Sequence, residues 1–149
     1  SSKCNFNAKK TMQIAQSLYE GIDIGNDRVG LITYMRTDSI RLSEEFIKSC
    51  KDYIVKNYGK SYYKGYEHVD KKSKNIQDAH EAIRPSNLKY TPESVKDYLS
   101  SDEYKLYTLI FDRAVSSLMS NAIVEDEKVI INNNSYQFEL NGERIVFDG

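Results

Sequence analysis

One decapeptide organises this chain: Gly30-Leu31-Ile32-Thr33-Tyr34-Met35-Arg36-Thr37-Asp38-Ser39. The run from Val29 to Tyr34 predicts a short β-strand, and polar residues follow it at once. The strand end therefore carries a phenol, a guanidinium, two hydroxyls and a carboxylate. Rigid scaffolds commonly present binding and catalytic groups on strand ends and on the loops that follow them. The pattern places the candidate site here.

Tyr34 and Arg36 have complementary chemistry. A phenol has a pKa near ~10, so it is a poor nucleophile at neutral pH until its anion is favoured. The guanidinium of Arg36 stays charged, can hold a phosphate oxygen bidentately, and can stabilise charge that builds on a phosphoryl group under attack. The pair suits covalent phosphoryl chemistry. Residue type alone does not settle this role, because the chain has 12 tyrosines and most tyrosines pack.

A second stretch follows downstream: His80-Glu81-Ala82-Ile83-Arg84-Pro85-Ser86. Residues 75–84 suggest a helical turn or two, which Pro85 ends because proline disfavours helix at the preceding residue. In such a helix His80 and Arg84 lie four apart on one face and can reach one phosphate. The pattern is not the His-Glu-x-x-His zinc motif, since Arg84 stands at the second ligand position. Taken alone, His80 is more typical of a surface or structural histidine.

Together the two stretches resemble, in the same order, the signatures of the type IA DNA topoisomerases. The similarity extends from the Lys9-Lys10-Thr11-Met12 helix to the closing Phe147-Asp148-Gly149. It implies that Tyr34 is the nucleophile, that Arg36 is a catalytic neighbour, and that His80 contacts DNA phosphate in the cleavage site. The further DNA contacts that it implies are Arg36, Thr37, Asp38 and Arg84.

In such enzymes the phenol attacks a single-strand phosphodiester and becomes linked to the 5′ phosphate. Another strand passes, and religation completes the relaxation of negative supercoils without a nucleotide cofactor. The resemblance thus implies single-stranded or negatively supercoiled DNA as partner, no membrane, and a nucleoid-associated place in the bacterial cytoplasm. Met35 is similar to bacterial topoisomerase I, whereas the topoisomerase III branch usually has Pro there.

The resemblance also divides the chain. Residues 1–122 look like the active-site tyrosine domain, and residues 123–149 look like the first strands of the arch that joins it to the rest. The family's magnesium centre and its assisting Glu lie in a toprim domain, whose Asp-x-Asp-x-Glu cluster this sequence lacks. We therefore expect no cofactor in this part and Mg²⁺ in the full enzyme. We also expect the toprim and other domains of the same polypeptide as partners, and an inactive chain when it is isolated.

Composition limits the possible functions. The chain has 149 residues, enough for one domain with a core, and 40% of them are hydrophobic. No apolar run approaches the ~20 residues that span a bilayer. The formal charge of −1 is not typical of a free-standing DNA binder. Cys4 and Cys50 have no metal-like spacing, so we expect free thiols in a reducing cytosol.

The elements expected from periodicity are mainly helical. Asn7 caps a helix that starts at Ala8 and stops at Gly21, with Lys9 and Lys10 on its wetter side, either solvated or against a DNA backbone. Ser43 caps a second helix that ends at Gly59. The apolar faces expected for these two helices comprise Met12, Ala15, Leu18, Tyr19 and Ile22 in the first, and Phe46, Ile47, Cys50, Ile54 and Tyr58 in the second.

The last third changes from helical to strand periodicity. Thr91 caps a short helix, and Ser100-x-x-Glu103 matches a capping box for the longest one. Three strands then follow at 129–131, 136–140 and 145–147, with turns at 132–134 and at Asn141-Gly142. The expected fold is α+β, mainly α with a small antiparallel β meander, resembling a winged-helix or CAP-like tyrosine domain. Because the strands run to the last residues, we expect a larger protein.

Residues Lys60 to Lys74 are rich in lysine, with three interleaved tyrosines and no hydrophobic period. Lysines attract phosphates and aromatic faces stack on unpaired bases, so this segment either contacts a DNA strand or is a solvated loop. Two rival readings of the whole chain stay open. One is a non-catalytic, winged-helix-like DNA-binding module, in which Tyr34 packs and Arg36 contacts the backbone. The other is a structural interaction domain, which the near-neutral charge favours.

Overall fold

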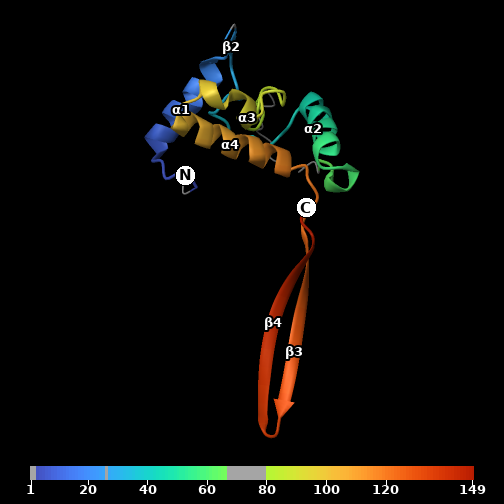
Figure 1. Ribbon diagram of the computed structural model, residues 1–149. Helices are drawn as coiled ribbons and strands as arrows, with labels where there is room; N and C mark the ends of the chain where they lie inside the picture. The colour runs from blue at the N-terminus through green and yellow to red at the C-terminus, as the bar shows by residue number, and fades with distance from the viewer. Residues whose placement is uncertain (1–2, 26, 67–79) are drawn as a thin grey trace, which may run out of the picture.

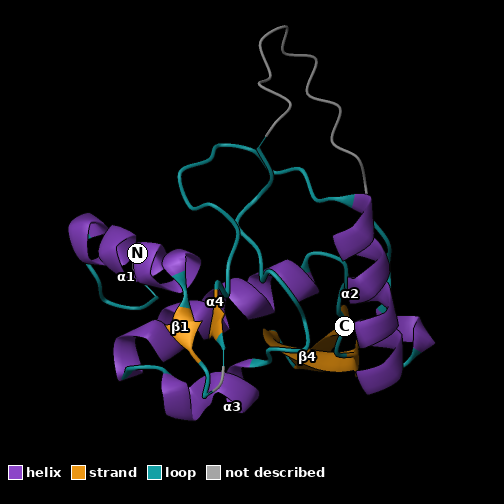
Figure 2. Cartoon of the chain, turned by 90° about the horizontal axis from the view of Figure 1, so that it is seen from above, coloured by secondary structure: helices purple, strands orange, loops and turns teal. Residues whose placement is uncertain are grey.

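A helical body and a long β-hairpin that projects from it make up this chain (Figure 1). The computed structural model describes residues 3–25, 27–66 and 80–149. Within those ranges the body holds the α-helices α1 (Ala8–Glu20), α2 (Glu44–Asn57), α3 (Pro92–Val95) and α4 (Ser101–Ser116), and the 3₁₀ helices η1 (Lys60–Tyr62) and η2 (Lys96–Tyr98). Seen from above, α1 and α2 lie on opposite sides of the body with α4 between them (Figure 2). The α+β class is confirmed.

The helix ends follow from local side-chain chemistry. The Asn7 side chain accepts a hydrogen bond from Lys10 N at 2.8 Å, and Gly21 ends α1 at φ 128°, where a side chain is disfavoured. Ser43 caps α2, and Ser100 forms the expected reciprocal capping box at the start of α4. The predicted starts of these helices are confirmed.

The core lies where α1, α2 and α4 meet the loops between them. Its buried side chains include Ala15, Leu18, Leu31, Phe46, Cys50, Ile54, Tyr107, Phe111 and Leu118. Three residues expected on apolar helix faces are instead exposed, namely Met12, Tyr19 and Tyr58. The buried positions are Ala15 and Leu18 on α1, and Phe46, Cys50 and Ile54 on α2.

Burial of Cys50 leads to a testable difference between the two cysteines. Burial raises the pKa of the Cys50 thiol to about 12, whereas Cys4 is half-buried. Since the thiolate is the reactive form, a thiol reagent at pH 8 should modify Cys4 in the native chain and leave Cys50 untouched. Mass spectrometry after timed labelling checks this, and denatured chain, which should take up two labels, is the control. Rapid double labelling of native chain would contradict it.

The strand expected from Val29 to Tyr34 is wrong. Strands β1 (Ile22–Asp23) and β2 (Arg28–Val29) pair antiparallel, and pairing stops at Val29. Beyond it the chain is extended, with one isolated bridge between Ile32 and Pro85. Its backbone groups bind the end of α1 and the 84–86 segment in place of a sheet.

The expected three-stranded meander is also wrong. Strands β3 (Ile123–Asn133) and β4 (Tyr136–Phe147) form one hairpin, and Gly142 lies inside β4, paired with Glu127. The turn falls near Asn134, which takes a left-handed φ of 54° that asparagine tolerates. At the base, the Tyr62 hydroxyl donates to Asp148 at 2.7 Å. The winged-helix likeness and the division at residue 122 stay predictions.

One face of the hairpin is apolar toward its tip. Side chains alternate along a strand and opposite residues share a face, so the register places five apolar side chains together. These residues, the apolar hairpin face, are Val129, Ile131, Tyr136, Phe138 and Leu140, and all are exposed. The opposite face there is largely polar, with an ion pair between Lys128 and Glu139 at 2.7 Å.

Candidate active site

Tyr34 lies at the surface of the body, between two other rings. The residue is 41% exposed, so its phenol is not enclosed by apolar packing. The Tyr19 ring meets it edge-on, with centroids 5.4 Å apart and planes at 65°. The His80 ring lies on it at 6.3 Å with planes at 30°. The structure therefore brings the expected nucleophile and the expected phosphate ligand together, although 46 positions separate them in the sequence.

Hydrogen bonds tie the segment before Tyr34 to the second motif. Thr33 N donates to Arg84 O at 3.0 Å, and Ser86 N donates to Leu31 O at 2.9 Å. The Thr33 hydroxyl donates to Ala82 O at 2.8 Å. These bonds fix the two motifs against one another, so the position of Tyr34 depends on both.

The same segment is tied to α1 through a close approach at Gly30. Leu31 N donates to Leu18 O at 2.7 Å, and a Cβ added at Gly30 would lie 2.6 Å from Tyr19 O. A methyl group cannot fit against a backbone oxygen at that distance unless the segment shifts. Glycine is therefore required for contact between α1 and the Tyr34 segment.

We expect Gly30→Ala to lower the free energy of unfolding by about 1–3 kcal/mol, as overpacking does in well-packed sites. Urea denaturation of the chain, followed by circular dichroism, measures the change. Gly142→Ala is the matched control, because Gly142 has nothing within 4 Å of an added Cβ. Equal stability of the two variants would contradict the argument.

Arg36 is presented to solvent next to a buried anchor. Met35 is only 7% exposed and packs in the core, while its neighbours Tyr34 and Arg36 are both exposed. Within residues 3–25, 27–66 and 80–149, no hydrogen bond or ion pair engages the Arg36 guanidinium. A fixed backbone with an unengaged cation suits an incoming phosphate.

Two further candidates lie in the loop that follows. The Thr37 hydroxyl accepts a hydrogen bond from Ser39 N at 3.0 Å, and the Ser39 hydroxyl accepts one from Arg41 N at 3.2 Å. The two hydroxyls therefore shape this loop through local turns. Asp38 between them is exposed.

The expected helix through His80 and Arg84 is wrong for residues 80–84, which form an irregular segment. The reason is that its backbone pairs with other segments, since Ala82 N donates to Arg41 O at 2.8 Å and Arg84 O accepts from Thr33 N at 3.0 Å. The Arg84 side chain also turns inward. Its Nε donates to Glu81 at 2.7 Å, its second terminal nitrogen donates to the Ser43 hydroxyl at 3.2 Å, and its guanidinium lies 4.7 Å above the Phe46 ring. His80 is exposed toward Tyr34. The two side chains therefore do not share a face.

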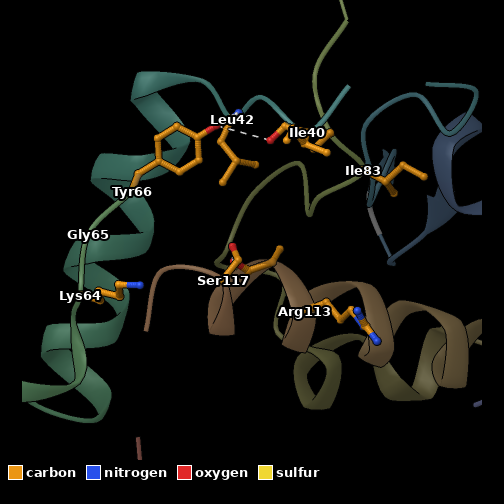
Figure 3. A pocket seen from close by; sticks show the side chains of 10 residues that line it. Ile40, Leu42, Lys64, Gly65, Tyr66, Ile83, Arg113 and Ser117 are labelled. Carbon is orange, nitrogen blue, oxygen red and sulfur yellow. Dashed lines mark hydrogen bonds between the residues drawn. The ribbon is translucent and has the colours of Figure 1, made fainter. Parts of the chain in front are cut away.

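The lysine-rich segment is described as far as Tyr66, and Lys71, Lys72 and Lys74 lie outside the described residues. Tyr62, Tyr63 and Tyr66 are half-buried against the core, which leaves little of each ring for a base. The Tyr66 hydroxyl donates to Ile40 O at 3.4 Å (Figure 3). Lys64 and Tyr66 line a pocket of about 510 Å³ with Leu42, Ile83 and Arg113, and Tyr34 is not part of it. Lys10, which the sequence leaves as either solvated or against a DNA backbone, pairs with Asp102 at 2.6 Å.

Among the described residues, no group of three or more His, Cys, Asp and Glu side chains could hold a metal ion. No described helix combines the length and apolar composition that a membrane crossing needs.

Sequence reasoning missed two residues of this site. The apolar pattern of the first helix predicts that Tyr19 faces the core, and Met35 indicates only the subtype. Met35 lies at a bend, where its side chain is buried between two exposed neighbours. A signal for Tyr19 existed in Gly30, since glycine commonly marks a close approach of two backbones.

Comparisons with known proteins identify the family of this chain. A family model described as DNA topoisomerase matches residues 1–149. DNA topoisomerase 1 of Rickettsia felis is 49% identical over 99% of this chain and 19% of its own length, and that of Campylobacter jejuni is 45% identical over 100% and 21%. The structure of full-length topoisomerase I from Thermotoga maritima matches 99% of this chain and 23% of its own, at a TM-score of 0.80 and 37% identity. The chain thus spans about a fifth of the length of these relatives.

Proposed function

The chain belongs to the DNA topoisomerase family, and from this we propose that the full-length protein is a type IA enzyme whose Tyr34 cleaves one DNA strand. The Tyr34 oxygen attacks phosphorus in a phosphodiester of single-stranded or negatively supercoiled DNA. The bond from phosphorus to the 3′ oxygen breaks, a 5′-phosphotyrosine ester forms, and the 3′ oxygen leaves as a hydroxyl. Strand passage follows, and the reverse attack reseals the strand and relaxes the DNA.

One observation carries the proposal: the exposed Tyr34 ring lies 6.3 Å from His80, and hydrogen bonds hold its segment to the second motif. A nucleophile needs exposure to reach its substrate and a fixed backbone to be aimed. Both are present at Tyr34, whereas a purely structural tyrosine requires neither exposure nor a cationic neighbour.

The remaining site residues have distinct proposed roles. Arg36 stabilises the charge on the phosphate under attack, and His80 contacts a phosphate beside Tyr34. Thr37 and Asp38 contact the strand from the loop. A direct contact by Arg84 would require its bonds to Glu81 and Ser43 to break, so we propose that Arg84 instead holds the His80 segment in place.

DNA approaches the body rather than the hairpin in this proposal. Residues 123–149 contain six acidic and two basic side chains, whereas residues 1–122 contain 19 basic and 16 acidic ones. The apolar hairpin face supports contact with other domains of the same polypeptide, since exposed apolar patches commonly mark interaction surfaces. Those domains include a toprim domain, which we propose holds the Mg²⁺ ion. The enzyme acts in the bacterial cytoplasm at the nucleoid.

The proposal is tested by trapping the reaction. The full-length enzyme is mixed with a 3′-end-labelled single-stranded oligonucleotide and Mg²⁺ and then denatured, and the labelled peptide is identified by mass spectrometry. We expect a 5′-phosphate linked to Tyr34. Tight binding with no covalent product would instead favour the non-catalytic DNA-binding module.

Arg36→Ala in the full-length enzyme should slow strand cleavage by about 10²–10³-fold, by analogy with removal of one oxyanion-hole donor. Its guanidinium is the charge placed to meet the developing negative charge. Single-turnover cleavage at saturating DNA measures the effect. Arg144→Ala is the control, because Arg144 lies on the hairpin and only pairs with Glu125 at the surface. An unchanged rate in Arg36→Ala would remove Arg36 from the catalytic set.

A further inference from the structure

Tyr19 has no role in the mechanism proposed above, yet its ring contacts the nucleophile. We infer that Tyr19 is a positioning residue, whose ring limits the orientations of the Tyr34 phenol before attack. This inference rests on the proposed function, since it presupposes that Tyr34 is the nucleophile.

The contact has the geometry of a specific aromatic pair. The two centroids are 5.4 Å apart and the planes are inclined at 65°, within the range for edge-to-face rings. Tyr19 is 42% exposed and Tyr34 is 41% exposed. The pair therefore lies at the margin of the core, and filling the interior does not explain its presence.

The backbone that carries Tyr19 is fixed to the backbone that carries Tyr34. Leu18 is fully buried, and its carbonyl accepts the Leu31 N–H at 2.7 Å. At Gly30 the Tyr34 segment passes so close to Tyr19 O that no side chain fits. The ring of Tyr19 thus has a defined place relative to Tyr34 and does not depend on a mobile loop.

Two rings lie against the Tyr34 phenol, and they come from different parts of the chain. One is Tyr19 at the end of α1, and the other is His80 in the second motif. Loss of the Tyr19 ring allows the phenol more orientations, so a smaller fraction of them is suited to attack on phosphorus. We expect only the rate of the chemical step to fall, because this role of Tyr19 requires no contact with DNA. The interaction energy of an aromatic pair of this kind corresponds to a change of about 3- to 10-fold in the rate of cleavage.

The test compares Tyr19→Leu and Tyr19→Phe in the full-length enzyme, with single-turnover cleavage measured over a range of single-stranded oligonucleotide concentrations. We expect Tyr19→Leu to lower the saturating rate about 3- to 10-fold without changing the half-saturating DNA concentration. Tyr19→Phe keeps the ring, so it should restore most of that loss. Tyr98→Leu, at another exposed tyrosine, is the control, and thermal denaturation of each variant shows whether it folds.

Three results would overturn the inference: an unchanged saturating rate in Tyr19→Leu, a loss confined to the half-saturating concentration, or an equal loss in Tyr19→Phe. The second result would indicate direct DNA contact and the third a role of the hydroxyl. If Tyr19→Leu does not fold, Tyr19→Phe and a Tyr19→Met variant decide on the same readouts. Failure of the proposed function is seen separately, as the absence of a Tyr34 adduct in the unmodified enzyme.

Discussion

Tyr34→Phe in the full-length enzyme is expected to abolish the covalent DNA adduct and relaxation while leaving affinity for single-stranded DNA largely intact. The change removes one oxygen from a ring that is half exposed, so the fold and the contacts with Tyr19 and His80 should survive. The proposed phosphate contacts by Arg36 and His80 do not need the phenol oxygen. Cleavage does need it, because the attacking atom itself is missing.

The measurement pairs a denaturing gel, which detects DNA held covalently, with fluorescence anisotropy for DNA binding. Tyr98→Phe serves as the matched control, since Tyr98 is similarly exposed and lies on η2. An adduct that persists in Tyr34→Phe would contradict the assignment and place the nucleophile elsewhere. Loss of both adduct and binding would show that Tyr34 is needed for DNA binding as well. That result would contradict the expectation that cleavage alone depends on the phenol oxygen.

The parts of the fold that follow from local chemistry could be predicted from the sequence. Asn7, Ser43 and Ser100 start the helices where a side-chain oxygen can accept an orphan N–H. Tyr34 and His80 could be named because each lies in a long motif. Their contact could not be derived from spacing, since it depends on hydrogen bonds between distant segments, such as those of Thr33 with Arg84, 51 positions further on.

The errors arose where tertiary pairing prevails over a local signal. Asn141-Gly142 is a strong hairpin signal, yet Gly142 pairs inside β4 because the turn forms near Asn134. The strand expected at 29–34 is extended, but its partners are a helix end and a loop. The helix expected to include residues 80–84 is an irregular segment there, in which Arg84 pairs with Glu81. In each case the local residue pattern is compatible with both the expected and the observed structure. The pattern alone therefore does not predict which of the two forms.

The isolated chain should neither cleave nor relax DNA, and activity should return when the missing parts are supplied. Its described residues offer no metal cluster, and we expect the Glu that assists the leaving 3′ oxygen to come from the toprim domain. Tyr34 is thus exposed and held in place, but in the isolated chain its attack lacks the acid that protonates the leaving 3′ oxygen.

The test mixes this chain with a separate toprim-containing fragment, Mg²⁺ and a labelled single-stranded oligonucleotide, and detects the adduct on a denaturing gel. We expect the adduct in the complete mixture and in none of the mixtures that lack one component. A complete mixture made with the Tyr34→Phe chain is the control for the site of attachment. An adduct formed by the chain alone would contradict the prediction, because it would show that this domain carries all the groups that cleavage needs.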